Sequence, residues 1–275
     1  MNGYGIGESP KKVVILPTKL REISGLALSG EGKLFTHNDE KGVVYQLDLM
    51  TGRIIKKFYL VMDIGKGKRC VKDDFEDIAI AGNRFFMVSS AGKLYEFREG
   101  NDREHVEAVV YETAVDALYE VEGLCYEPVQ DELLLSWKKK SIKKNGKHAA
   151  EKNDFQTADY VPVFAFSLKT MSRYVLPKFM LDMKAIARAA GKRSFRPSGI
   201  ACEPTRGTLF LISSRSRLIV EIDASDGEPL SSKPLPKKYH PQPEGIVFLP
   251  DNTLLISDEG RFHGTISVYK NKLKD

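Results

Sequence analysis

The sequence lacks long hydrophobic runs, and it contains few cysteines, few histidines and one tryptophan. No stretch of its 275 residues approaches the roughly 18 consecutive apolar residues that suggest a transmembrane helix, so we predict no membrane span. Residues 1–12 have no apolar signal-peptide core. Because this segment is short, we expect a cleaved secretory or lipoprotein leader ahead of the chain.

Three cysteines, at positions 70, 125 and 202, are an odd number without paired spacing, and nothing in the sequence resembles a zinc motif. Cys125 and Cys202 each fall within an apolar strand pattern, which is typical of buried free thiols. The five histidines form no cluster, and no G-x-S-x-G motif marks a catalytic serine. Cysteine usage therefore indicates no compartment, and histidine supports no specific catalytic chemistry.

The net charge of +5 is concentrated in one segment. Residues 138–152 read KKKSIKKNGKHAAEK, within a basic insertion that we place at about 138–158. Such a run is usually a solvated loop, and this one has no interleaved aromatic residues that would stack on bases. The sequence therefore does not favour nucleic-acid binding.

A short signature occurs five times and determines the predicted fold. It consists of a glutamate or serine, a glycine or aspartate and two apolar or small residues, followed by a turn and an apolar strand. Its second residue is in turn Gly25, Asp77, Gly123, Gly199 and Gly245. Two of the four spacings are 46 residues, which suits a four-stranded propeller blade. The spacing of 76 residues includes the basic insertion and residues 182–196.

Turn residues divide each repeat into short apolar or alternating runs, as expected for strands. The fifth repeat lacks its outer run, and Lys11–Pro17 supplies it, which closes the ring and covers a strand edge. We therefore predict an all-β protein, a five-bladed β-propeller of four-stranded antiparallel blades, with residues 1–275 forming one domain. The alternative is a six-bladed ring with a blade hidden in residues 169–196. Residues 181–191 instead read as a short helix that ends at Gly191.

In a propeller the first strand of each blade lines the central channel, so equivalent residues of the five repeats should meet at one mouth. Glu76, Glu122 and Glu244 occupy the same position of the signature. Carboxylates brought together need a compensating cation, and an oxygen-only donor set favours Ca²⁺. These three glutamates are therefore the predicted metal ligands. The alternative is that they accept backbone N–H bonds and hold neighbouring blades together.

Other residues are expected around the same mouth. The remaining mouth residues are Glu22, Ser24, Asp39, Ser198, Asp258 and Glu259. Four basic residues could contact an anionic group of a ligand: Lys138, Arg215, Arg217 and Arg261. We expect an unidentified ligand or protein partner to bind here.

The repeat signatures resemble those of a bacterial family. The strings EISGLA, DFEDIAI, VEGLCYEP and PEGIVFLPDNTLLISDEG are similar to the blade starts of SdiA-regulated (YjiK-like) propellers, from residue 22 to residue 269. The resemblance implies a cell-envelope, periplasmic or secreted protein of unestablished biochemical role, with bound calcium. The family's Glu-Gly pair is kept at Glu122 and Glu244, but Ser24 and Ser198 depart from it. A site that takes a carboxylate from every blade is therefore not supported.

Two functions of different classes remain. The first, which we expect, is a non-enzymatic binding or scaffold role at the cell envelope, performed by a monomer. The second is a metal-dependent hydrolase of an ester, lactone or phosphoester, phytase-like in its chemistry. In that case a bound metal at the mouth would polarise the substrate or activate water.

Overall fold

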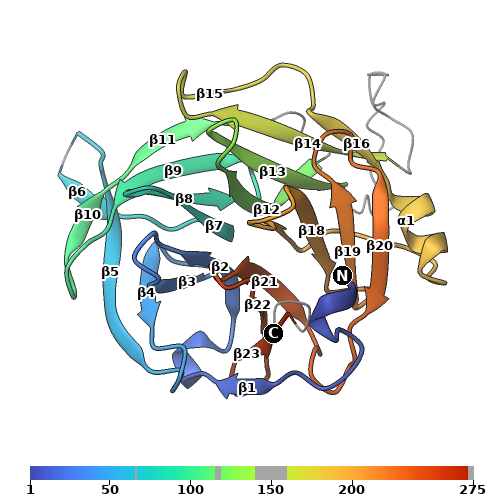
Figure 1. The fold of residues 1–275 in the computed structure, drawn as a ribbon. Helices are drawn as coiled ribbons and strands as arrows, with labels where there is room; N and C mark the ends of the chain where they lie inside the picture. The colour runs from blue at the N-terminus through green and yellow to red at the C-terminus, as the bar shows by residue number, and fades with distance from the viewer. Residues whose placement is uncertain (66, 115–118, 140–159, 272–275) are drawn as a thin grey trace, which may run out of the picture.

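The computed structural model describes residues 1–65, 67–114, 119–139 and 160–271. Five antiparallel sheets stand around a central axis (Figure 1), which confirms the predicted five-bladed propeller. Clusters of buried apolar side chains fill the spaces between neighbouring blades. No helix within the described ranges is long and apolar enough to cross a membrane.

Each blade has four main strands, named below in order from the channel outward. Blade one contains β2 (Ile23–Leu28), β3 (Leu34–Asn38), β4 (Val43–Leu47) and β5 (Ile54–Asp63). Blade two contains β7 (Phe75–Ala81), β8 (Arg84–Ser89), β9 (Lys93–Arg98) and β11 (Val109–Glu112). Blade three contains β12 (Tyr119–Glu127), β13 (Glu132–Lys139), β14 (Tyr160–Ser167) and β16 (Phe179–Asp182). Blade four contains β17 (Gly199–Cys202), β18 (Thr208–Ser213), β19 (Leu218–Asp223) and β20 (Pro229–Pro234).

Blade five is closed by the N-terminal strand, as predicted. It contains β21 (Pro243–Phe248), β22 (Leu254–Asp258), β23 (Thr265–Tyr269) and β1 (Lys12–Ile15), and β1 is antiparallel to β23. Val14 and Leu16 are buried in a cluster shared with blade one, whereas Ile15 is 65% exposed. The alternation places one face of β1 in the core, and this burial fixes the strand on the edge of β23.

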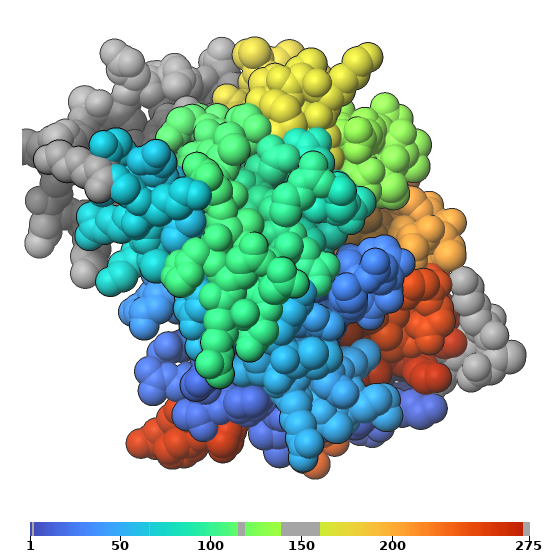
Figure 2. Space-filling view, turned by 90° about the vertical axis from the view of Figure 1, so that its left-hand side faces the viewer, coloured from blue at the N-terminus to red at the C-terminus, as the bar shows by residue number. Residues whose placement is uncertain are grey.

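Blade two differs from the prediction at its outer edge. Residues 106–112 read VEAVVYE, an alternating run that predicts one outer strand, but the structure divides them at Ala108. β10 (His105–Glu107) pairs in parallel with β5 of blade one, and Ala108 donates its N–H to Val61 at 2.9 Å. β11 then returns to blade two and pairs with β9. Figure 2 views the ring from this side, with these green residues lying over the blue and cyan residues of blades one and two.

The segment that would have held a sixth blade belongs to blade three. β15 (Ser172–Arg173) and β16 both pair with β14, and a helix, α1 (Met183–Ala189), follows them. The Asp182 side chain caps α1 by accepting the N–H of Ala185 at 2.8 Å. Residues 169–196 therefore complete a blade, and the six-bladed alternative is wrong. The predicted basic insertion lies outside the described residues from position 140 onward.

The small residue of the signature is required because neighbouring inner strands approach closely. A Cβ on Gly199 would lie 2.5 Å from the carbonyl oxygen of Glu244, which belongs to the next blade. A Cβ on Gly25 would lie 2.1 Å from Oδ1 of Asp77. Asp77 replaces the glycine in blade two and uses its carboxylate to accept the N–H of Leu124, in blade three, at 2.8 Å. The glycines of the repeat signature are therefore explained by close contact between the inner strands of neighbouring blades.

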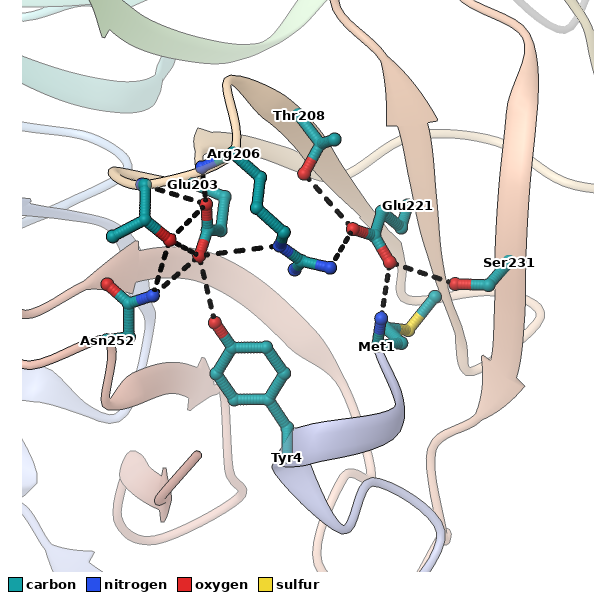
Figure 3. Close-up of polar contacts among 9 residues, drawn as sticks. Met1, Tyr4, Glu203, Arg206, Thr208, Glu221, Ser231 and Asn252 are labelled. Carbon is teal, nitrogen blue, oxygen red and sulfur yellow. Dashed lines mark hydrogen bonds and ion pairs between the residues drawn. The ribbon is translucent and has the colours of Figure 1, made fainter. Parts of the chain in front are cut away.

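The first residues of the chain pack between blades four and five, a position that the sequence did not indicate. The short 3₁₀ helix η1 (Asn2–Tyr4) places the Met1 ammonium on the Glu221 carboxylate and the Tyr4 hydroxyl 3.4 Å from Glu203 (Figure 3). Arg206 bridges the two glutamates, at 2.9 Å from Glu221 and 3.7 Å from Glu203. Burial alone would raise the pKa values of both glutamates, but hydrogen bonds and these cations lower them. Buried carboxylates are fully compensated here.

Candidate functional site

A β-bulge recurs at the start of the inner strands and carries the predicted ligands. The pairing of β7 with β8 shifts between Phe75 and Asp77, so that Glu76 is the extra residue. Similar shifts occur at Glu122 in β12 and at Glu244 in β21. A bulge re-aims a side chain away from the regular ladder and is common beside binding sites. The three carboxylates interact electrostatically with one another, so the structure brings them together.

These carboxyl groups are held in an environment that favours their protonated form. Burial, and then the charges of Glu122 and Asp74, raise the pKa of Glu76 to about 9. Burial and the charge of Glu259 raise the pKa of Glu244 to about 8, although hydrogen bonds from Ser214 and Gln242 oppose the shift. Burial raises the pKa of Glu122 to about 7 against the opposing effect of Lys138. Unlike the glutamates near Met1, this group is under-compensated.

Lys138 is the cation that the protein itself places in the group. The sequence assigned this residue to an anionic ligand, but its ammonium group forms an ion pair with Glu122 and lies 4.0 Å from Glu120. The cause is strand register, since Glu120 and Lys138 lie opposite each other in the pairing of β12 with β13. Glu76 has no ion-pair partner within the described residues. Arg196 and Arg215 line the same cavity, so basic side chains other than Lys138 also lie near these acids.

A second group of acids lies on blades five and one. Burial, followed by the charges of Asp39 and Glu22, raises the pKa of Glu259 to about 7. Asp39 has a raised pKa for the same reasons, burial first and then its acidic neighbours. Glu22 is half-exposed and forms an ion pair with Arg21 at 2.9 Å. Because Glu259 also raises the pKa of Glu244, the two groups are continuous. We call the six residues Glu22, Asp39, Glu76, Glu122, Glu244 and Glu259 the acidic mouth.

Asp258 is not part of the open mouth. It is fully buried, 2.8 Å from Nδ1 of His240, and the other ring nitrogen of His240 lies 2.7 Å from the Tyr269 hydroxyl. Asp258 also accepts the N–H of Gln242, so it fixes the loop that enters β21. No sequence pattern predicted this pairing, because His240 lies in a proline-rich connection. The role we infer for Asp258 is to position that loop.

The two signature serines lie in the walls between blades. The Ser198 hydroxyl donates to the carbonyl of Pro243 at 2.8 Å and accepts the N–H of Ser214, so it links blades four and five. Ser24 is buried, and its carbonyl accepts the hydroxyl of Ser257 at 3.1 Å. The Ser198 side chain therefore replaces the glutamate of the signature with a contact between blades, whereas at Ser24 the contact is made by the backbone.

The arginines predicted for anion binding are distributed unequally. Arg215 lines a cavity of about 350 Å³ with Lys138, Glu122 and Glu244. Arg261 lines a neighbouring cavity of about 440 Å³ that also contains Glu22 and Glu259. Arg217 lines neither cavity; it has a left-handed backbone conformation (φ 46°) in the turn before β19. Two of the arginines thus lie beside the acidic mouth.

The acidic mouth has donors suited in kind to a hard cation, since all of them are oxygen atoms. As they stand, however, no three of the described His, Cys, Asp or Glu side chains are close enough to enclose a metal ion. A cation would have to draw Glu76 and Glu244 together or displace Lys138 from Glu122. Within the part of the chain that the structure describes, the alternative role, acceptance of backbone N–H groups between blades, is filled by Asp77 and not by these three glutamates.

The raised pKa values predict that stability falls as pH rises above neutrality. A carboxyl whose pKa is higher in the folded chain than its ordinary 4.5 makes its full contribution to stability only below pH 4.5. It loses this contribution as pH passes its folded pKa. Between pH 6.5 and 9, with divalent cations chelated, we expect a loss on the order of 1 kcal/mol from Glu244 alone.

Thermal unfolding of the parent and of Glu244→Gln, measured across this pH range, checks the prediction. The variant should show a shallower decline, because it lacks the titrating group and keeps the shape of the side chain. The comparison cancels contributions that both proteins share. Parallel curves for the two proteins would contradict a protonated Glu244.

No family model matches this chain, and no curated protein matches it. Among solved structures it is similar to glutaminyl cyclase from Myxococcus xanthus, with 12% identity, a TM-score of 0.58, and coverage of 95% of this chain and 94% of that one. Streptogramin B lyase matches with 11% identity, a TM-score of 0.50 and coverage of 94% and 97%. The luciferin-regenerating enzyme matches with 12% identity, a TM-score of 0.50 and coverage of 94% and 95%. At these identities the likeness establishes the propeller fold alone, and the resemblance to the SdiA-regulated family stays a prediction.

Proposed function

We propose that this propeller is a binding protein whose acidic mouth takes up a cation, with Ca²⁺ as the first candidate. The observation that carries the proposal is the burial of three neighbouring carboxyl groups, those of Glu76, Glu122 and Glu244, beside the ammonium group of Lys138, which raises the pKa of each carboxyl. A divalent cation would remove the repulsion that now favours protonation. The cell-envelope location belongs to the same proposal and follows from the family resemblance alone.

Glu76 and Glu244 are the residues that would hold the cation. Glu244 already accepts hydrogen bonds from Ser214 and Gln242, which would orient its carboxylate. Glu122 would contribute only as far as the cation competes with Lys138. Because the ligands must lose their protons, binding should strengthen as pH rises from 6.5 to 9.

We expect Ca²⁺ to raise the melting temperature by roughly 5–10 °C at a hundredfold excess over its Kd, since a ligand of the folded state alone stabilises it by mass action. A chelator should reverse the rise. Glu76→Gln and Glu244→Gln should each reduce it. Glu31→Gln is the matched control, because Glu31 is an exposed turn residue that pairs with Lys33 at 2.6 Å. Thermal shift measurements and calorimetric titration supply the readouts.

Lys138→Gln separates the two roles considered for this lysine. If Lys138 competes with the cation, the variant should bind Ca²⁺ more tightly than the parent. If it serves only an anionic ligand, Ca²⁺ affinity should stay the same. Equal Ca²⁺ responses in the parent, Glu76→Gln and Glu244→Gln would overturn the proposed site.

A hydrolase acting at the same mouth is the second candidate. It is favoured by one observation, the position of Arg215 and Lys138 in one cavity with Glu122 and Glu244. Such a cavity could hold an anionic substrate beside carboxyl groups that titrate near neutrality. Release of 4-nitrophenol from its acetate or phosphate ester, dependent on Ca²⁺ and lost in Glu244→Gln, would support this candidate. Calcium binding without turnover would support the binding role and contradict the hydrolase.

A further inference from the structure

The end of the channel opposite the acidic mouth contains a larger cavity, of about 500 Å³. Its lining comes from the far ends of the five inner strands and from the loops that follow them, and is largely apolar. Two cysteines, Cys125 and Cys202, lie among these apolar residues. Among the described residues, the cavity shares no lining residue with the two cavities of the acidic mouth. Its chemistry is therefore independent of the cation site proposed above.

The two thiols are in contact across the boundary between blades three and four. Sγ of Cys125, on β12, lies 3.4 Å from Sγ of Cys202, on β17. Cys125 is buried, whereas Cys202 is partly exposed. The third cysteine, Cys70, is exposed on β6 (Lys68–Cys70), on the outer edge of blade one. The structure therefore separates one pair of thiols from one solitary thiol.

We propose that Cys125 and Cys202 form a covalent modification site, at which a small-molecule disulfide oxidises the pair to a disulfide that links blades three and four. The supporting observations are the 3.4 Å contact and the cavity that both thiols line, which gives a small reagent access to them. The neighbouring inner strands hold the pair in place, because Gly123 and Ile200 are in close contact beside it.

The reaction proceeds in two thiol–disulfide exchanges. Cys202, the more accessible thiol, loses its proton and attacks one sulfur of the reagent, which releases one small thiol and leaves a mixed disulfide. Cys125 then attacks the Cys202 sulfur and releases the second small thiol. Two protein S–H bonds become one S–S bond, and the two electrons reduce the reagent to two thiols. Burial, and then the contact with Cys202, raise the pKa of Cys125, so the second exchange should accelerate with pH.

The link would join two inner strands across 77 residues of sequence. A cross-link over so long a segment restricts the unfolded chain, and we expect the melting temperature to rise by roughly 10 °C on oxidation. A thiol reductant should reverse the rise. The modification would thus reinforce one boundary of the ring, at a distance from its closing strand.

The experiment uses the full chain carrying Cys70→Ser, so that only the paired thiols remain. The reduced protein is incubated with oxidised glutathione, and free thiols are counted after denaturation while intact mass is measured without reductant. We expect two thiols to fall to none, with a loss of two hydrogens and no retained glutathione. Cys70→Ser/Cys125→Ser is the matched control and should keep glutathione on Cys202.

Three outcomes would overturn the proposal. These are retention of both thiols in Cys70→Ser, a stable glutathione adduct there, or disulfide-linked dimers. Should the substituted proteins fail to fold, the parent serves instead: its three thiols should fall to none, with a single glutathione on Cys70. Peptide mapping of the oxidised parent should then recover the Cys125 and Cys202 peptides as one linked species, and separate peptides would refute the link.

Discussion

Replacement of Lys11–Pro17 by a Gly/Ser linker of equal length should destabilise the protein by more than 4 kcal/mol. This segment supplies β1, which pairs along its whole length with β23 and closes blade five. Its removal would expose the β23 edge and empty the positions of Val14 and Leu16 in the core. Burial of one such leucine is worth about 2–5 kcal/mol, and the whole fold of a typical domain about 5–15 kcal/mol. The linker keeps the reach of residues 1–10, so their contacts with blade four are not lost as well.

Two point variants give a finer test of the same strand. Leu16→Ala should cost about 2–5 kcal/mol, because Leu16 is 1% exposed and packs between blades five and one. Ile15→Ala should change stability by no more than about 0.5 kcal/mol, because Ile15 is 65% exposed on the opposite face. Chemical denaturation followed by circular dichroism gives both values. Equal losses would mean that β1 does not hold this register.

The repeat signature was sufficient to predict the ring and its closure. The four glycines of the signature mark places where neighbouring inner strands come within contact distance, and this steric requirement is visible in the sequence as a repeated glycine. The closing strand was predictable because the fifth repeat lacked an outer strand and Lys11–Pro17 had no other partner. The split of residues 105–112 between blades one and two was not, since nothing in that run distinguishes pairing with β5 from pairing with β9.

The site was predictable in part. Symmetry brings equivalent residues of the repeats together, whereas strand register and side-chain pairing differ from blade to blade. Glu76, Glu122 and Glu244 follow the symmetry. The pairing of Lys138 with Glu122 depends on the register of one hairpin, and the burial of Asp258 depends on His240 from a connection outside the repeat. The contact of Cys125 with Cys202 was also hidden, because their positions in the signature differ by one residue. Such pairs can be identified only from the three-dimensional structure.

Gly245→Ala should destabilise the protein by about 3 kcal/mol, through the contact between blades five and one. An added Cβ would lie 2.3 Å from the Ser257 hydroxyl and 2.4 Å from the carbonyl oxygen of Ser24. The serine hydroxyl could rotate away, but it would give up its hydrogen bonds to the Gly245 N–H and the Ser24 carbonyl. The Ser24 carbonyl is backbone of β2, so relief there requires the inner strand of blade one to move. Overpacking of this kind usually costs about 1–3 kcal/mol, and rigid neighbours on two sides place this case at the upper end.

Gly30→Ala is the matched control, because no atom of the described residues lies within 4 Å of its added Cβ and its φ is not in the left-handed region. It should leave stability unchanged or raise it by up to about 1 kcal/mol, since alanine restricts the unfolded chain. Denaturation midpoints of the two variants, measured at one pH in the presence of a chelator, isolate the packing effect from cation binding. A Gly245→Ala protein as stable as Gly30→Ala would show that the inner strands are farther apart than the structure places them. In that case the glycine repeated in the signature would need a cause other than contact between blades.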